Sequence, residues 1–584
     1  MYKLLDKLLM IDKGGRIIYN GNPMDAIAYF KREANYVNPE ERECYVCGNV
    51  KTEQPLRIVE ARIVNPYGKL IRKRKVSPED WYKLYLENFE KKFEWKSKRD
   101  LTKKEPLPKN WFSIPNRKKQ FWIFAMRDAL SKLKDKQYLA INILEAPLLA
   151  LILGFFTKYL IGSPDDPKLY LFSENVNVPA YLFMSVVVSL FIGLNVSAEE
   201  IIRDRRLRKR ESFLNLSRFS FLNSKIFVLF ILSAVQSLSF VLIGNAILEI
   251  EGMTLSYWAI IFSTACFANM LGLNISSGLN SVVAIYVLIP LILVPHLLFS
   301  GVIVNYDKLH TSIASKEFVP RIGDLMITRW SYEALAVTQF KNNRYQRHFF
   351  EEEKAMSQSS YYGSTLIPEL IKLNDACHWA SERNDASTVK KHSKTLAAAL
   401  QQFHKDIPNL VPRDLIKEEL SSYPDSLRNT IENTLLSAQN KYNREYQYYS
   451  TRKDSKIEEL VKEKGSIDHL VALKQKHFNE ALADWVLDRK EVRQLEFYED
   501  HYIQRKHPIY KSPASKWGRA HFYAHSKRMG PILIPTGIFN VLVMWMGVLL
   551  LYVTLYLDIL RRIIHYFETF KLRRLNKRLQ RLGT

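Results

Sequence analysis

Long uncharged, apolar runs alternate along the 584-residue chain with segments that are dense in charge. A helix that crosses a bilayer needs about 20 mostly apolar residues, because each residue rises about 1.5 Å through a hydrocarbon layer about 30 Å thick. Three runs meet this requirement without any Asp, Glu, Lys or Arg: Ala180–Val196, Ile226–Leu248 and Met529–Leu557. We predict one transmembrane helix in each of them.

A fourth uncharged run, Gly252–Tyr306, contains 55 residues and is too long for one crossing. Its polar, glycine-bearing segment Asn274–Ser281 divides it into two apolar halves, Trp258–Leu273 and Val282–Val304. We predict two further spans there, joined as a tight helical hairpin.

The first span is predicted at Leu139–Ile161, where Glu145 and Lys158 interrupt the apolar pattern. Lys158 can extend its ammonium to the interface, whereas Glu145 needs a polar partner inside the bundle. The fold class that follows is mainly α: a polytopic membrane protein with six transmembrane helices and a large helical insertion between the fifth and sixth.

Two segments that are rich in Lys and Arg, the loop 197–225 after the second span and the tail 558–584, contribute to the net charge of +25. Basic loops remain in the cytoplasm, and the acidic loop Gly162–Pro179 is therefore expected outside. This arrangement places both termini in the cytoplasm and the protein in the inner (cytoplasmic) membrane. Because topology explains the charge, the predicted partner is the lipid bilayer and not nucleic acid.

The segments outside the spans are predicted to be soluble. An amphipathic helix carrying Trp122, Met126, Ala129 and Leu133 should lie on the inner surface before the first span. The external region needs a packed core of its own, because Cys266 and Cys377 cannot pair in this topology. The predicted domains are 1–31, 32–117 (a linker), 118–304 (the amphipathic helix and five spans), 305–528 (external), 529–557 (the sixth span) and 558–584 (a basic tail).

Cys44 and Cys47 form a single C-x-x-C motif, and no histidine precedes His296. A closed zinc site within one chain would therefore lack two ligands, so free thiols are favoured and no metal is predicted. The alternative is a four-cysteine zinc site shared by two copies of the chain.

No motif for catalysis is present in the sequence. The only Gly-Lys pair, Gly68-Lys69, is followed by Leu70 where a phosphate-binding loop needs Ser or Thr. No G-x-S-x-G or H-E-x-x-H motif occurs. We therefore predict no catalytic residues and no cofactor in this chain.

Four segments resemble ABC transporters of the ABCG type, the white and pleiotropic drug resistance group, which have an ABC-2 type membrane domain. The opening LLMIDKGGRIIYNGNPMDAIAYF is similar to the end of their nucleotide-binding domain. After the second span, SAEEIIRDRRLRKRESFLNLSR resembles their coupling-helix region. FSGVIVN and RWSYEALAVTQF resemble their external gate and the segment that re-enters the membrane surface.

The resemblance implies roles for particular residues. Glu199, Arg210, Glu211 and Arg218 would couple the membrane domain to the ATPase, Val302 and Ile303 would form the external gate, and a substrate cavity near Ile192 would lie between two copies. Glu211 and Arg218 are two helical turns apart, which predicts that they share one face. The alternative is a solvated basic loop that serves only orientation.

The Walker A, Walker B and signature motifs of these ATPases are absent from the sequence. The chain would be an ATPase only as part of a complete transporter, in which ATP and Mg are expected. The implied partner is a nucleotide-binding domain, as a missing upstream part or as a separate chain, and the implied assembly is a homo- or heterodimer.

The function predicted from the sequence is the membrane subunit of an ATP-driven exporter for a lipophilic or amphiphilic substrate, since the spans offer aliphatic and aromatic side chains with few charges. The alternative is a membrane-anchored receptor or scaffold that acts through its external helical domain.

Overall fold

The computed structural model describes residues 5–43, 50–64, 70–90, 115–162, 169–211, 216–411, 423–498, 500–567 and 569. The chain divides into two compact units, Met1–Ser113 and Ile114–Thr584. Cys44 and Cys47 lie outside the described residues, so the C-x-x-C prediction stays a prediction.

The first unit begins with the predicted hairpin, in which Gly14 and Gly15 form the turn with φ of +90° and +78°. Side chains other than glycine rarely adopt such angles, which explains the glycine pair. The elements of this unit are β1 (Leu8–Asp12), β2 (Arg16–Gly21), α1 (Pro23–Glu33), α2 (Gln54–Val59), β3 (Arg62–Val64), β4 (Leu70–Arg74), α3 (Pro78–Tyr85) and the π-helix η2 (Leu86–Glu90).

The core of this unit joins its beginning to residues predicted to form a linker. Phe30 of α1 packs edge-on against Trp81 of α3, with ring centroids 5.2 Å apart, and Ile58 of α2 is buried in the same cluster. The predicted boundary at residue 31 therefore does not separate two bodies. The hairpin and α1 present more apolar surface than they can bury alone, and α2 and α3 cover it.

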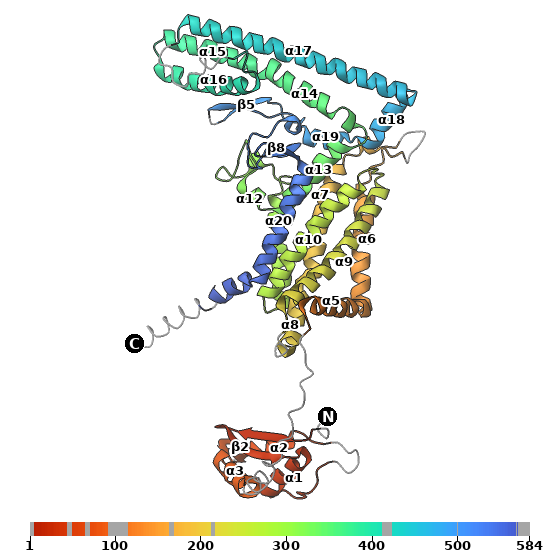
Figure 1. The fold of residues 1–584 in the computed structure, drawn as a ribbon, viewed down its shortest axis with the longest axis vertical. Helices are drawn as coiled ribbons and strands as arrows, with labels where there is room; N and C mark the ends of the chain where they lie inside the picture. The colour runs from red at the N-terminus through yellow and green to blue at the C-terminus, as the bar shows by residue number, and fades with distance from the viewer. Residues whose placement is uncertain are drawn as a thin grey trace. The chain divides into compact units, whose positions relative to one another are not determined.

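The second unit contains a bundle of apolar helices (Figure 1). Five helical stretches are long and apolar enough to cross a membrane. They are α6 (Lys136–Thr157), α7 (Val178–Ala198) continuing into α8 (Glu200–Glu211), α9 (Arg218–Ile247), α10 (Thr254–Gly278) and α20 (Thr536–Tyr556). The predicted fifth span forms a shorter apolar helix of 17 residues, α11 (Val282–Leu298), so the number six stays a prediction.

The predicted start of the last span at Met529 was wrong. Residues Ser526–Met529 (β7) and Ile532–Pro535 (β8) form an antiparallel hairpin that turns at Gly530, and the helix begins only at Thr536. Residues 529–535 of this hairpin carry no charge, so hydropathy alone cannot separate them from a helix, but Pro531 and Pro535 disfavour a helix before Thr536.

Small residues allow α7 and α10 to approach closely. A Cβ atom on Gly193 would lie 2.6 Å from the Cβ of Ala268, and one on Gly272 would lie 2.0 Å from the Ser197 hydroxyl. Packing at small residues is the main source of helix association inside a membrane. These two helices therefore form the tightly packed centre of the bundle.

Helix α5 (Arg117–Lys134) lies across one end of the bundle beside α8 (Figure 1). Trp122, Met126 and Leu133 are exposed on it, whereas Phe124 and Ala125 are buried. An exposed apolar stripe beside Lys118 and Lys119 is what the predicted interfacial helix requires.

The other end of the bundle carries the helical region predicted between the last two spans (Figure 1). Its first long element, α13 (Ile327–Asn342), is buried from Ile327 to Phe340 and packs against α7, α10 and α20. The remaining elements here are η3 (Phe172–Glu174), η5 (Tyr306–Lys308), α12 (Arg321–Asp324), η6 (Gln346–His348), α14 (Phe350–Ser360), η7 (Tyr361–Leu366), α15 (Ile367–Glu382), α16 (Ala386–Asp406), α17 (Asp425–Lys464), α18 (Ile467–His477), α19 (Glu480–Val486), β5 (Leu495–Tyr498), β6 (His501–Gln504) and η9 (Pro508–Tyr510).

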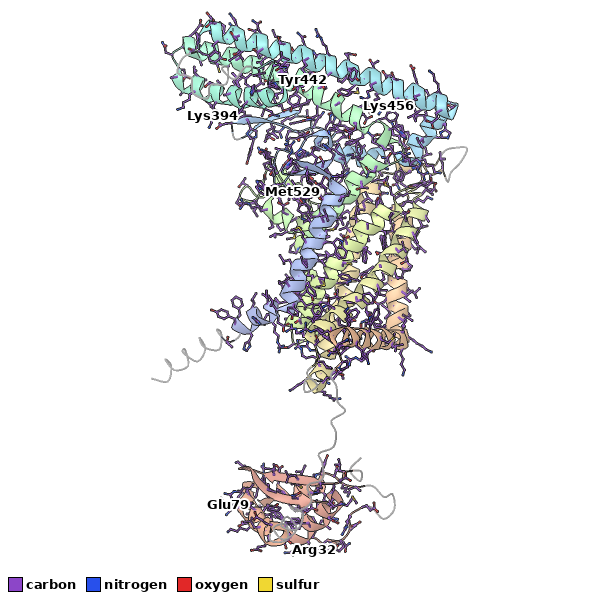
Figure 2. The ribbon with its side chains drawn as sticks, viewed as in Figure 1. Arg32, Glu79, Lys394, Tyr442, Lys456 and Met529 are labelled. Carbon is purple, nitrogen blue, oxygen red and sulfur yellow. The ribbon has the colours of Figure 1, made fainter. Side chains whose placement is uncertain are left out.

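Helices α15, α16 and α17 have a hydrophobic core of their own. Tyr442 of α17, labelled in Figure 2, stacks on Tyr362 with ring centroids 4.9 Å apart. Lys456 of the same helix forms an ion pair of 2.8 Å with Glu352, which ties α17 to α14. Cys377 is buried in this core as a free thiol, so packing and not an intrachain disulfide stabilises the region.

Candidate functional site

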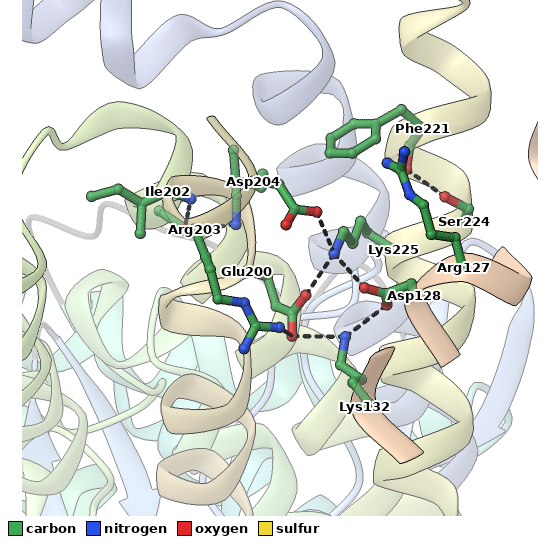
Figure 3. A network of polar contacts seen from close by, with 12 residues as sticks. Arg127, Asp128, Lys132, Glu200, Ile202, Arg203, Asp204, Phe221, Ser224 and Lys225 are labelled. Carbon is green, nitrogen blue, oxygen red and sulfur yellow. Dashed lines mark hydrogen bonds and ion pairs between the residues drawn. The ribbon is translucent and has the colours of Figure 1, made fainter. Parts of the chain in front are cut away.

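Five charged residues converge where α5, α8 and α9 meet at one end of the bundle (Figure 3). We call them the ion cluster: Asp128 and Lys132 from α5, Glu200 and Asp204 from α8, and Lys225 from α9. Charged side chains are rarely buried unless they are paired, so a cluster of this kind needs a structural or functional reason.

The two lysines bridge all three helices. The ammonium of Lys225 contacts Asp128 and lies 3.0 Å from Glu200 and 2.7 Å from Asp204. That of Lys132 lies 2.6 Å from Asp128 and 2.8 Å from Glu200. Each lysine thus binds the same two carboxylates, and the cluster is one connected network.

The positive and negative charges of the ion cluster balance when the neighbouring Arg203 is counted. Three carboxylates face two lysines, and the guanidinium of Arg203 lies 3.9 Å from Glu200. Burial by itself would raise the pKa of Asp128, but Lys225 and Lys132 outweigh it and hold that pKa below its ordinary value. Asp128 therefore stays ionised, and removing one partner would leave an unbalanced buried charge.

Backbone and amide contacts hold α5 against the start of α9. The Gln120 side chain donates to the carbonyl of Pro115 and accepts from the backbone N–H of Ser217. The Ser220 hydroxyl donates to the carbonyl of Arg117. Side chains of Asn116 and Ser217 cap the first turns of the two helices, which fixes where each begins.

Helix α8 is anchored at its first turn, and most side chains near its other end are exposed. The Ser276 hydroxyl at the end of α10 accepts the backbone N–H groups of Ile201 and Ile202, each at 3.1 Å. Arg205 donates to the carbonyls of Ser277 and Leu279. Beyond this point the side chains of residues 206–210 are exposed, so α8 presents a basic end on a fixed base.

The predicted coupling residues lie in α8 or next to it, but Glu211 and Arg218 contact different helices. Glu199 is half-buried between α7 and α8, and Arg210 is exposed. Glu211 pairs with Arg127 of α5 at 2.7 Å, whereas Arg218 pairs with Asp558, just after α20, at 2.6 Å. The prediction that Glu211 and Arg218 share a helical face was wrong, because α8 ends at Glu211 and a new helix starts at Arg218.

The predicted substrate and gate residues lie apart in the single chain. Ile192 is buried in the bundle and lines a small space with residues of α9 and α10, among them Ser233 and Gln236. Val302 is half-buried and Ile303 is 56% exposed in the turn after α11. Gly301 adopts a φ of +81° there, and a Cβ atom on it would meet the Tyr306 ring at 2.5 Å.

A second buried network, which the sequence reasoning missed, fixes α13 to β7 and α20. The Glu333 carboxylate accepts from Lys527 at 2.8 Å and from Asn540 at 2.9 Å, and Arg329 lies 3.6 Å away. Lys527 and Glu333 are 0% exposed. Burial lowers the pKa of Lys527 to about 8, although Glu333 opposes this shift.

Among the residues that the structure describes, no three His, Cys, Asp or Glu side chains are grouped so as to hold a metal ion. The ion cluster joins three helices through buried ion pairs, and breaking such a pair typically costs about 3–5 kcal/mol.

A comparison with protein-family models matches residues 119–340 to the ABC-2 type transporter family. The matched range begins in α5 and ends in α13, so it includes the ion cluster. No curated protein matches the chain. The chain therefore carries an ABC-2 type membrane domain, the permease component of a transporter, and such domains typically pair with a nucleotide-binding partner.

Proposed function

We propose that the chain is the membrane half of an ATP-driven, ABCG-like exporter that moves a lipophilic or amphiphilic substrate across the cytoplasmic membrane. The observation that carries this proposal is the ion cluster, which links the exposed basic end of α8 to the helices of the membrane domain.

The cluster supports a mechanism in which α8 transmits force. A partner that displaces α8 must move α5 and α9 with it, because breaking a buried ion pair typically costs about 3–5 kcal/mol. Helix α7 leads directly into α8. A movement of α8 therefore also reaches Ile192 in the bundle, where the resemblance to the ABCG group locates the substrate cavity.

The direction of insertion follows from charge. The basic end of α8, with Arg206, Arg208 and Arg210, belongs in the cytoplasm by the positive-inside rule. Helices α14 to α19 lie at the opposite end of the bundle and are therefore external in this proposal.

A second copy is part of the proposal. Val283, Val287, Leu291 and Val294 are exposed along α11 at helical spacing. This apolar stripe can face lipid or a partner helix, and the resemblance favours a partner that would complete a cavity between two copies.

The first unit supports an ATPase partner, since the hairpin and α1 contain the segment that resembles the end of a nucleotide-binding domain. ATP and Mg would bind to the complete ATPase, in the same polypeptide or in another. The separate core of α15–α17 supports the second candidate, a receptor or scaffold that acts outside the cell.

Purification from native membranes through a tag on this chain separates the two candidates. The exporter proposal predicts that the purified complex hydrolyses ATP in a vanadate-sensitive manner after reconstitution. It also predicts that Lys225→Met lowers the stimulation by amphiphilic compounds more than the basal rate. A complex without such hydrolysis contradicts the proposal and favours the receptor or scaffold.

A further inference from the structure

A cleft of about 620 Å³ opens among the elements at the external end of the bundle. Gly301 and Asn305 of the predicted gate segment form part of its wall, and Arg505 after β6 and Pro508 of η9 form another part. Sites for small ligands typically occupy about 300–1,000 Å³. The cleft thus has the size of a ligand site and borders the predicted exit of the membrane pathway.

Aromatic rings give the cleft an apolar side. Trp485 is 39% exposed at the end of α19 and lines the cleft with Phe522 and Tyr523. The rings of Phe522 and Tyr523 lie 4.1 Å apart, and Tyr306 packs edge-on against Phe522 at 5.3 Å. These rings offer a surface for the apolar body of a ligand.

Most of the charged groups in the cleft have partners in its walls. Arg505 contacts Asp307 and lies 3.3 Å from Glu496, which also pairs with Lys316 at 2.7 Å. Arg493 lies 3.5 Å from Glu491, and Asp484 pairs with Arg489 at 3.0 Å. The pairs of Asp307 with Arg505 and of Lys316 with Glu496 hold the segment after the predicted gate to β5 and to the end of β6. Charged groups that are paired in this way are less available to a ligand.

Three ammonium groups that line the cleft, those of Lys308, Lys490 and Lys511, have no hydrogen bond or ion pair with any described residue. Among the acidic residues that line the cleft, Asp488 alone has a side chain without a hydrogen bond or ion pair to any described residue. Burial, with Glu491 nearby, raises the pKa of Asp488. The lining as a whole has six basic and six acidic side chains, and its groups without a partner among the described residues are three ammonium groups and one carboxylate.

Lys511 is the most enclosed of the three ammonium groups, because Lys308 and Lys490 are exposed and Lys511 is half-buried. Burial lowers the pKa of Lys511, and the opposing attraction of Glu317 is smaller. Glu317 has its own contact, His501 at 3.6 Å. A half-buried ammonium without a direct ion pair is destabilised, and an anion placed beside it would restore part of the lost interaction.

We propose that this cleft binds an anionic amphiphile, with the acidic headgroup on Lys511 and the apolar body over Trp485 and Phe522. The site goes beyond the proposed transport function, since binding at the external side requires no ATPase. An anionic lipid of the outer leaflet and a free amphiphile both have this chemistry.

The test is equilibrium dialysis of radiolabelled decanoate against the full chain in nanodiscs of neutral phospholipid, with empty nanodiscs as the blank. We expect saturable binding of decanoate and no comparable binding of decyltrimethylammonium. Lys511→Gln should weaken decanoate binding at least tenfold, whereas Lys511→Arg should retain it and Trp485→Ala should weaken it several-fold. Lys490→Gln, an exposed lysine of the same cleft, is the matched control and should bind as the unmodified chain does.

Nanodiscs that contain phosphatidylglycerol distinguish the two sources of the anion. Competition with decanoate supports a lipid headgroup, and unchanged decanoate binding supports a free amphiphile. Equal binding of the cationic amphiphile, or unchanged binding by a folded Lys511→Gln variant, would overturn the proposal. Even if Lys511→Gln does not fold, the comparison of decanoate with decyltrimethylammonium on the unmodified chain decides whether the cleft prefers an anion.

Discussion

The ammonium of Lys225 and the carboxylate of Glu200, 25 residues apart in the chain, form a buried ion pair of 3.0 Å that joins α9 to α8. Their side chains are only 4% and 2% exposed. This pair connects the basic helix at the end of the bundle to a long apolar helix, and the proposed coupling depends on it.

Replacing Lys225 with Met should destabilise the membrane domain strongly. The change leaves Asp204 without its ion pair and leaves Asp128 and Glu200 with one lysine, Lys132, in place of two, and an uncompensated buried charge typically costs about 3–5 kcal/mol. Adding Glu200→Met to Lys225→Met should recover part of the loss, since one charge of each sign is then removed.

The measurement is the apparent unfolding temperature in detergent. We expect a fall of at least about 5 °C for Lys225→Met, given that about 1 kcal/mol shifts a domain of this size by a few degrees. Arg206→Met, on the exposed end of α8, is the control and should unfold with the unmodified protein. Equal temperatures for both variants would show that the cluster contributes nothing to stability.

Exchanging the charges of Arg218 and Asp558 tests the contact between α9 and the end of α20. The pair measures 2.6 Å, and both side chains are partly exposed. Arg218→Asp should lower the unfolding temperature, because it puts two carboxylates face to face. Asp558→Arg in the same chain should restore most of the loss. If the double variant is as unstable as the two single changes together, the contact is absent in solution.

Acid should destabilise the region around α14 and η9 through His525. This side chain is buried, donates from Nδ1 to the carbonyl of Ile509 at 2.9 Å, and has its pKa lowered by burial to about 3. In the unfolded chain its pKa returns to about 6.5, so the unfolded state binds the proton first as the pH falls. The stability that neutral His525 provides is therefore present above pH 6.5 and is lost progressively as the pH falls from 6.5 towards 3.

Thermal unfolding between pH 7.5 and 5 measures this loss, which cannot exceed about 1.4 kcal/mol per pH unit for one group. His525→Gln removes the titration and should give a shallower dependence on pH. His469→Gln, an exposed histidine of α18, is the control and should keep the steep dependence. An identical slope in His525→Gln would mean that other groups cause the acid effect.

Orientation can be read from single cysteines in a chain from which the native cysteines are removed. Ser437 is exposed on α17 and Arg206 is exposed on α8, and the two helices lie at opposite ends of the bundle. An impermeant maleimide added to intact cells should label Ser437→Cys and spare Arg206→Cys. The reverse pattern would place the basic helix outside.

Most of the apolar helices could be predicted because hydropathy over about 20 residues is a strong local signal, as for Ile226–Leu248, which α9 covers up to Ile247. Residues 529–535 of the hairpin were misassigned to the span since they are also uncharged, and the pairing between the strands, together with Pro531 and Pro535, distinguishes them from a helix. The first unit was divided wrongly because the burial of Trp81 against Phe30 depends on contacts between distant residues.

The sequence indicated which part of the chain contains the candidate site, but not which residues form the ion cluster. A cluster of arginines after the second span predicted a basic cytoplasmic loop, and the structure forms α8 in this part of the chain, while its side of the membrane stays a prediction. The buried acid is Glu200, however, and the sequence gives no reason to prefer it over its neighbour Glu199. Lys225 and Lys132 resemble solvated surface lysines until α5 is packed on α9, so their burial could be found only in three dimensions.

The most direct test of the account is a site-specific cross-link from the exposed end of α8. A photoactivatable residue at Arg210, in native membranes, should form cross-links that mass spectrometry maps to an ABC-type nucleotide-binding domain, and ATP with vanadate should change their yield. The same residue at Ser437 is the control and should give no such product. Cross-links from Arg210 that reach only lipid, or only proteins without a phosphate-binding loop, would contradict the assignment of α8 as the contact with the ATPase.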